Sequence, residues 1–132
     1  MIQYILFGAS WGSGGHRQLG YGDASSRGSS ADQMGDYLPE VELPTGFVAE
    51  RMITTLYTTF VLSSAGEIVC FGRNIAGLCG LGHANTWNEG TGDSLQPIDL
   101  GTDFVPAQLG GGGYTACAIS AVGEVKWCVF SF

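Results

Sequence analysis

Strand-forming residues gather in two matching segments, 57–72 and 114–127. In the first, apolar, aromatic or β-branched residues run from Tyr57 to Leu62, a break of Ser, Ala and Gly follows, and a second apolar run extends from Ile68 to Phe71. Two such runs around a short glycine-containing loop predict a β-hairpin. The second segment aligns with the first without a gap, 57 residues further on (114 − 57 = 57), and predicts a second hairpin.

The repetition extends beyond the hairpins. Residues 34–38 and 41–43 recur 57 positions later, and the glycine-rich segment 18–23 recurs 60 positions later, as residues 78–83. The difference of three residues falls in a Ser-rich loop of the first copy, and a fixed period with such a loop insertion is typical of repeat architectures. We expect glycines at tight turns and matched tyrosines to occupy corresponding structural positions; these repeat positions are Gly20, Gly22, Tyr57, Gly66, Gly72, Gly80, Gly82, Tyr114 and Gly123.

Weaker signals predict the remaining elements. Residues 4–7 predict the last strand of an earlier unit, although we favour Trp11–Gly12 as the end of that strand because Gln18–Gly20 then aligns with the later copy. A strand that contains proline is expected at the edge of a sheet. Clusters of glycine and serine predict loops. We therefore expect edge strands at 37–43 and 95–100, further strands at 47–54 and 105–109, and loops at 12–36 and 73–87.

Composition and charge narrow the classes of partner. The formal net charge is −7, with one Lys and four Arg, so the clustered cations that bind nucleic acid or an anionic membrane are missing. Solubility alone explains the acidity, and a basic protein surface is the alternative. The first residues carry neither a secretory signal nor a transmembrane span. With 45% hydrophobic residues and 22 glycines, the chain predicts a folded domain of short strands and tight turns.

Four cysteines are present: Cys70, Cys79, Cys117 and Cys128. They do not form a C-x-x-C pair, and we expect buried thiols because cysteine packs as a small hydrophobe. The alternative is a disulfide between Cys117 and Cys128, on the two arms of the second hairpin. Disulfide bonds require a strict geometry, which the two positions would have to satisfy.

Several linked motifs resemble the regulator of chromosome condensation repeat family. They are Gly66-Glu67-Ile68-Val69-Cys70-Phe71-Gly72-Arg73-Asn74, Gln18-Leu19-Gly20-Tyr21-Gly22-Asp23, Met34-Gly35-Asp36-Tyr37-Leu38-Pro39 and Tyr114-Thr115-Ala116-Cys117-Ala118-Ile119. The resemblance covers about residues 11 to 128. It implies a β-propeller, in which each blade is a four-stranded antiparallel sheet packed against its neighbours. The fold class we expect is therefore all-β: two consecutive blades of an open, incomplete ring.

The resemblance has departures. Tyrosine stands where the family has the hairpin His, Gly14 replaces its Asn, Arg17 replaces its Gly, and His83 replaces its Asp. We expect a single partial propeller over 1–132, with repeat units at 11–71 and 72–128 and a tail at 129–132. Because open blades expose apolar faces and strand edges, we also expect self-association or further blades from another chain.

Catalytic and metal-binding alternatives are weaker. Gly8-Ala9-Ser10-Trp11-Gly12 matches the nucleophile-elbow pattern of a serine hydrolase, but poor helix formers follow it. Cys79 and His83 have a spacing that zinc ligands use, and Asp23, Asp32 and Asp36 lie in one loop that could hold calcium. The first pair lacks a second pair nearby, and the aspartates lack the spacing of a calcium loop. No cofactor is expected.

The sequence therefore predicts a non-catalytic scaffold that binds an unidentified protein, and it does not indicate a compartment. Loops on a rigid sheet commonly carry recognition, so we expect contacts from residues 12–36 and 83–95. The charged residues expected to contact the partner are Asp23, Arg27, Asp32 and Asp36. The resemblance also implies a second hypothesis, a fragment of a guanine-nucleotide exchange factor for a small GTPase.

Overall fold

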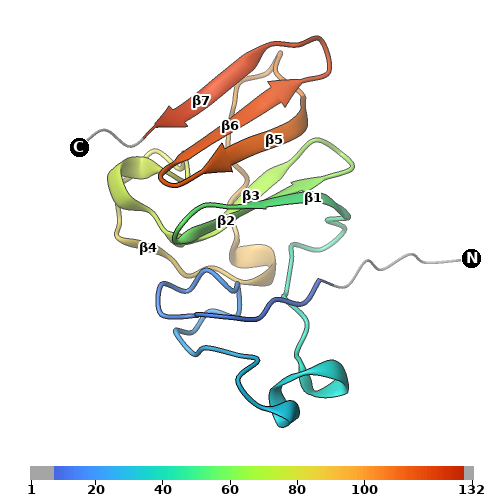
Figure 1. Ribbon diagram of the computed structural model, residues 1–132. Helices are drawn as coiled ribbons and strands as arrows, with labels where there is room; N and C mark the ends of the chain where they lie inside the picture. Colours follow the sequence, from blue (N-terminus) through green and yellow to red (C-terminus); the bar gives the residue numbers. More distant parts are fainter. Residues whose placement is uncertain (1–7, 130–132) are drawn as a thin grey trace, which may run out of the picture.

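The protein is all-β, as expected. The computed structural model describes residues 8–129, with side chains to residue 126, and Figure 1 shows two antiparallel sheets stacked one above the other. The first sheet has the order β1-β2-β3-β4, with β1 at Ala49–Thr54, β2 at Thr58–Ser63, β3 at Ile68–Arg73 and β4 at Trp87–Asn88. The second has the order β5-β6-β7, with β5 at Pro106–Gly112, β6 at Thr115–Ser120 and β7 at Val125–Val129.

Both predicted hairpins form, in the same register. Leu62 of β2 faces Ile68 of β3, and Ile119 of β6 faces Val125 of β7, 57 positions on. The turns also match, because the hydroxyl of Ser63 accepts the amide hydrogen of Glu67 at 3.0 Å, and Ser120 and Glu124 repeat this contact at 3.0 Å. The repeat in the sequence is therefore a repeat in three dimensions.

The two weaker strands are also present, as β1 and β5. Each carries a β-bulge against its hairpin, between Ala49 and Arg51 in β1 and between Pro106 and Gln108 in β5. These bulges are again 57 positions apart. The second sheet has three strands within the described residues.

The predicted edge strands at 37–43 and 95–100 were wrong. The 3₁₀ helices η2 (Gly35–Tyr37) and η4 (Gly92–Ser94) precede segments that form no strand. Ile98 donates a single backbone hydrogen bond to β3, at the Ile68 carbonyl. Each segment contains a proline, which cannot donate to a ladder. Its apolar side chains instead pack flat on the first sheet, and the fourth strand is β4. Short helices η1 (Ala31–Gln33) and η3 (Ile75–Gly77) lie in the predicted loops, while the strand predicted at 4–7 lies outside the described residues.

The core lies on both faces of the first sheet. Phe60, Leu62 and Ile68 are at most 3% exposed and pack against Ala116 and Ala118 of the second sheet. On the opposite face a second cluster packs beneath the segment after η2; its members are Val61, Val69, Phe71, Leu95, Val41, Leu43, Phe47 and Ala49. Each fully buried Phe, Leu or Val contributes about 1.5–3 kcal/mol relative to an exposed one.

The second sheet is covered on one face only. Along β6 the buried residues Ala116 and Ala118 alternate with the half-buried Cys117 and Ile119. The period of two shows that one face meets the first sheet and the other does not. The covered face carries small residues, which allow the larger Phe60 and Leu62 to approach.

The expectation of buried thiols was wrong for Cys70 and Cys79. Cys70 of β3 and Cys79, both fully buried, form a disulfide with their Cα atoms 5.9 Å apart, and Cys117 is a free thiol. The bond ties the end of β3 to the glycine loop that follows it. Because Cys117 is a free thiol, the alternative disulfide between Cys117 and Cys128 does not form.

Candidate interaction surface

Two loops that are far apart in the sequence lie side by side. Arg17 Nε is 3.2 Å from Glu89 Oε1, and the rings of His16 and Trp87 stack with centroids 5.5 Å apart. A Cβ added to Gly22 would come within 3.1 Å of the Thr91 side chain, so glycine permits this close approach. We call residues 12–36 and 83–95 together the loop surface.

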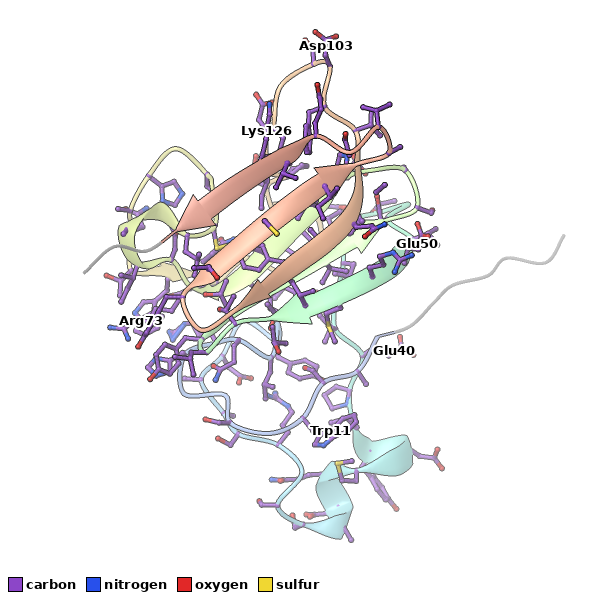
Figure 2. The ribbon with its side chains drawn as sticks, turned by 45° about the horizontal axis from the view of Figure 1, so that its top comes forward. Trp11, Glu40, Glu50, Arg73, Asp103 and Lys126 are labelled. Carbon is purple, nitrogen blue, oxygen red and sulfur yellow. A yellow bond between two sulfur atoms is a disulfide. The ribbon has the colours of Figure 1, made fainter. Side chains whose placement is uncertain are left out.

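Aromatic rings and a cation gather where β2 and β6 begin and β3 ends. The Tyr57 ring lies 4.1 Å from His16 and 6.1 Å from Tyr114, centroid to centroid. Arg73 places its guanidinium 5.4 Å from the Tyr57 ring and 5.9 Å from the Trp87 ring, and Figure 2 shows Arg73 at the edge of the molecule. We call these five residues the aromatic–cation cluster.

The cluster carries unused hydrogen-bonding capacity. Among the described residues, His16 Nδ1 and Arg73 Nε are buried and have no hydrogen-bond partner, and no carboxylate forms an ion pair with Arg73. Arg17 Nε lies within ion-pair distance of Glu89 but outside hydrogen-bond geometry. A guanidinium over aromatic rings is stabilised by the ring faces and can still receive an anionic group.

The four charged residues expected to contact a partner fall into two kinds. Arg27 binds Asp23 through two hydrogen bonds of 3.1 and 2.8 Å and lies 4.0 Å above the Tyr21 ring. The hydrogen bonds from Arg27, together with one from the Ser25 amide, lower the pKa of Asp23 to about 2. Asp32 and Asp36 lie exposed at η1 and η2. The first two therefore hold the loop together, and the other two leave acidic charge on its surface.

The repeat glycines adopt matching backbone angles. The φ values are +81° and +64° at Gly20 and Gly80, +74° and +75° at Gly22 and Gly82, and +82° and +86° at Gly66 and Gly123. Side chains would also collide at two of the repeat positions. A Cβ on Gly20 would lie 2.8 Å from Phe71, and a Cβ on Gly72 would lie 2.4 Å from the Tyr57 carbonyl oxygen.

The hydrolase and metal hypotheses find no site in residues 8–129. The Ser10 hydroxyl donates to the Leu19 carbonyl at 2.5 Å, and no helix follows it. His83 instead contacts Asn74 and Asn85. Cys79 is in the disulfide, and the described part of the chain contains no group of three residues that could bind a metal. No helix in that part is long and apolar enough to cross a bilayer.

The sequence did not indicate three members of the aromatic–cation cluster: His16, Arg73 and Trp87. Tyr57 and Tyr114 were found because they repeat. His16, Arg73 and Trp87 have no similar residue at the matching position of the other repeat, so a comparison of the two repeats does not identify them. Their meeting depends on the fold of both loops. The link between Asp93 and Thr45 was missed for the same reason: Asp93 accepts hydrogen bonds from the Thr45 amide and hydroxyl at 2.5 and 2.9 Å, which lower its pKa.

Comparison with known proteins supports the fold. No family model and no curated protein matches the sequence. Yeast RCC1 (Prp20), solved bound to Kap60, superposes with a TM-score of 0.61 at 18% identity over 90% of this chain and 24% of its own. The Saccharomyces cerevisiae Prp20p structure, described with its binding to Gsp1p and histones, gives 0.62 at 18% identity over 90% and 25%.

Human WBSCR16 gives a TM-score of 0.58 at 21% identity, over 87% of this chain and 27% of its own. The chain thus spans about a quarter of the length of these structures. At such low identity the likeness shows the fold, which is that of RCC1-type β-propeller blades, and the predicted resemblance is confirmed at that level.

Proposed function

We propose that this chain is a non-catalytic scaffold that binds a protein through the loop surface, with the aromatic–cation cluster at its centre. The single observation that carries the proposal is the junction of the two loops at His16, Arg17, Trp87 and Glu89. It creates one continuous surface on rigid sheets. Such an arrangement is typical of recognition sites, and Trp, Tyr and Arg dominate binding energy at protein interfaces.

The charge pattern supports a partner with both signs of charge. Arg73 forms no ion pair with a carboxylate among the described residues and can receive an acidic group, while Asp32 and Asp36 remain exposed for basic groups. The surrounding protein carries a net charge of −7, so long-range steering favours a basic partner surface. A carboxylate within that surface would complete the contact with Arg73.

Quantitative affinity capture tests the proposal, with the intact chain as bait. The Arg73→Ala and Trp87→Ala variants remove the centre of the cluster. Val122→Ser, at an 83% exposed position in the β6–β7 turn at the other end of the strands, is the matched control. We expect a protein that binds wild type and control about tenfold better than both cluster variants, and binding is then measured with that protein purified. An identical set of captured proteins for all four baits would contradict the proposal.

Exchange activity on a small GTPase is the second candidate. The fold likeness to Prp20p, which is described as binding Gsp1p, favours it, but this chain spans only a quarter of that structure. Release of a fluorescent nucleotide from a GTPase, measured with and without the chain, tests this candidate separately. Stimulated release that survives Arg73→Ala would assign the activity to another surface.

A further inference from the structure

Residues 8–12 occupy the place of a third strand. They match residues 68–72 of β3 at the offset of 60. The amide of Val41 donates to the Gly8 carbonyl at 2.7 Å. At the matching place, the amide of Ile98 donates to the Ile68 carbonyl at 2.8 Å. Gly12 and Gly72 have φ values of +115° and +113°. The segment thus lies where the third strand of a preceding sheet would lie.

One edge of this segment is paired and the other is free. Gly12 exchanges two hydrogen bonds with Arg27, in the place where β3 meets β4, and the amide and carbonyl of Ser10 both bond the Tyr21 hydroxyl at 3.0 Å. The amides and carbonyls of Ala9 and Trp11 make no hydrogen bond to any residue within 8–129. An unpaired edge of this kind is a template for another strand.

The matching residues of β3 show what kind of strand belongs at that edge. Val69 and Phe71, 60 positions after Ala9 and Trp11, face Val61 and Thr59 of β2. In β2 the alternate residues Phe60 and Leu62 then fill the space between the two sheets. Within residues 8–129 no antiparallel strand lies at the free edge, and the strand that fits it would carry bulky apolar residues at alternate positions.

A solvent-open cavity of about 560 Å³ lies beside the free edge. Its walls are chiefly apolar, from residues that include Leu19, Val41, Leu43, Met52, Val61 and Phe71. The matching space between the two sheets measures about 190 Å³ and has Phe60 and Ile68 on its wall. In the larger cavity Gly8 stands in the place of Ile68 and Ser10 in the place of Cys70. The extra volume corresponds to side chains that a neighbouring strand would supply.

We propose that the free edge and the cavity form a strand-addition site for an extended segment of a protein partner. The segment pairs antiparallel to residues 8–12, bonds the backbone of Ala9 and Trp11, and places bulky uncharged side chains in the cavity. Glu50 and Arg51 are the charged lining residues and both are exposed, so the cavity itself selects apolar groups. This site is additional to the loop surface proposed above.

A peptide with the sequence of residues 57–64, which includes all of β2, is the probe, with lysines at its ends for solubility. Binding to the intact chain is measured by calorimetry. N-methylation at the residue matching Val61 removes a donor that points to residues 8–12, whereas N-methylation at the residue matching Phe60 modifies a group that points away. We expect the first peptide to bind about tenfold more weakly than the unmodified peptide and the second to bind nearly as well.

Two variants of the chain locate the site. Ala9→Pro removes a free donor without removing an internal hydrogen bond, and Met52→Glu places a charge at the cavity wall on a side chain that is 59% exposed. Both should weaken peptide binding about tenfold with the circular dichroism spectrum retained. Arg73→Ala should leave it unchanged, so failure of this site and failure of the loop surface are distinguishable.

Other occupants would overturn the proposal. Absence of peptide binding, or equal effects of the two N-methyl groups, would contradict strand addition. Sedimentation of the chain as a dimer that Ala9→Pro dissociates would assign the edge to a second copy. Peptide binding that appears only in a chain lacking residues 1–7 would assign the cavity to the chain's own first residues.

Discussion

The two glycine loops, residues 12–23 and 72–83, have matching positive φ values at their glycines but are held by different chemistry. In the second loop the disulfide joins Cys70 to Cys79, whereas the matching pair in the first, Ser10 and Leu19, is joined by a hydrogen bond of 2.5 Å. One covalent bond and one side-chain hydrogen bond thus close the same turn. The repeat requires the geometry of the closure and tolerates a change in the bond that makes it.

A second difference lies inside the loops. Asn74 is fully buried, accepts a hydrogen bond from the Cys79 amide at 2.9 Å and donates to the His83 carbonyl at 3.0 Å. Its counterpart is Gly14, where a Cβ would lie 2.0 Å from the Ser25 carbonyl oxygen. In the first loop the chain itself, with its longer Ser-rich insertion, occupies the space that an Asn side chain fills in the second.

The third difference concerns where strain lies. Gly77 has a φ of +74° and its counterpart Arg17 has a φ of +61°, a conformation that costs a side chain other than glycine about 1 kcal/mol or more. The second loop has a residue of this kind at the preceding position, where Ala76 has a φ of +51°. Each loop therefore contains one strained residue, and the first loop has the weaker closure. We expect the second loop to be the more stable one because of its closure, and four measurements test this.

The largest effect should follow removal of the disulfide. A bond closing a loop of nine residues contributes about 3 kcal/mol, so Cys70→Ser with Cys79→Ser should lower the free energy of unfolding by that amount. Urea denaturation measures it. Cys117→Ser, which removes the free thiol, should change stability by less than about 1 kcal/mol. Equal losses from both variants would show that the disulfide does not distinguish the second loop.

The next largest effect should come from Asn74→Ala. The change leaves the Cys79 amide and the His83 carbonyl without their partner, which costs about 2 kcal/mol. Asn85→Ala, at a nearby exposed position, is the control and should cost less than about 0.5 kcal/mol. Similar midpoints of thermal unfolding for the two variants would mean that the second loop does not depend on Asn74.

Substitutions at the matching positions 17 and 77 should change the free energy of unfolding by smaller amounts and in opposite directions. In a Glu89→Gln background, where the ion pair is already absent, Arg17→Gly should raise the free energy of unfolding by about 0.5 kcal/mol, because glycine accepts the positive φ. Gly77→Ala should lower it by about 1 kcal/mol. Chemical denaturation of both variants measures the signs, and a loss at Arg17→Gly would contradict the assignment of strain.

The smallest effect concerns pH. The pKa of Asp23 is lowered from 3.8 to about 2, first by the Arg27 hydrogen bond, so its stabilisation is present above about pH 4 and is lost as the pH falls towards 2. The Asp23 side chain is 45% exposed, so solvent screens the pair and the loss should be about 0.5 kcal/mol or less. Asp23→Asn should flatten the stability profile in that window. The second loop has His83 at this position and so lacks the carboxylate of this pair.

The sequence predicted what local patterns control. Both hairpins and the weaker strands β1 and β5 follow from β-branched and aromatic runs bounded by glycine, and the period of 57 predicted equivalent sheets. The prediction of strands at 37–43 and 95–100 failed because their alternating apolar residues pack on a sheet face. Alternation alone does not show whether a segment has a neighbouring strand to pair with. β4 is two residues long, too short to give a pattern.

The candidate surface was predicted only in part. The loops were found from their composition, and the matched tyrosines from the repeat. The disulfide was missed because the loop from Arg73 to Leu78 brings Cys79 back beneath β3, and that path depends on the positive φ values in the loop. Of the four charged residues expected to face a partner, sequence alone could not separate the Asp23–Arg27 pair, which neutralises itself, from the exposed Asp32 and Asp36.

The neighbouring rings of Tyr57 and Tyr114 give the architecture an optical signature. The Tyr57 and Tyr114 rings are inclined by 57° to each other, and each belongs to a different sheet. Two transition dipoles at that inclination and spacing couple, so the near-ultraviolet circular dichroism of this protein should contain a band that exists only while neighbouring sheets keep their mutual orientation. Loosening between the sheets would then be visible before either hairpin unfolds, without any added label.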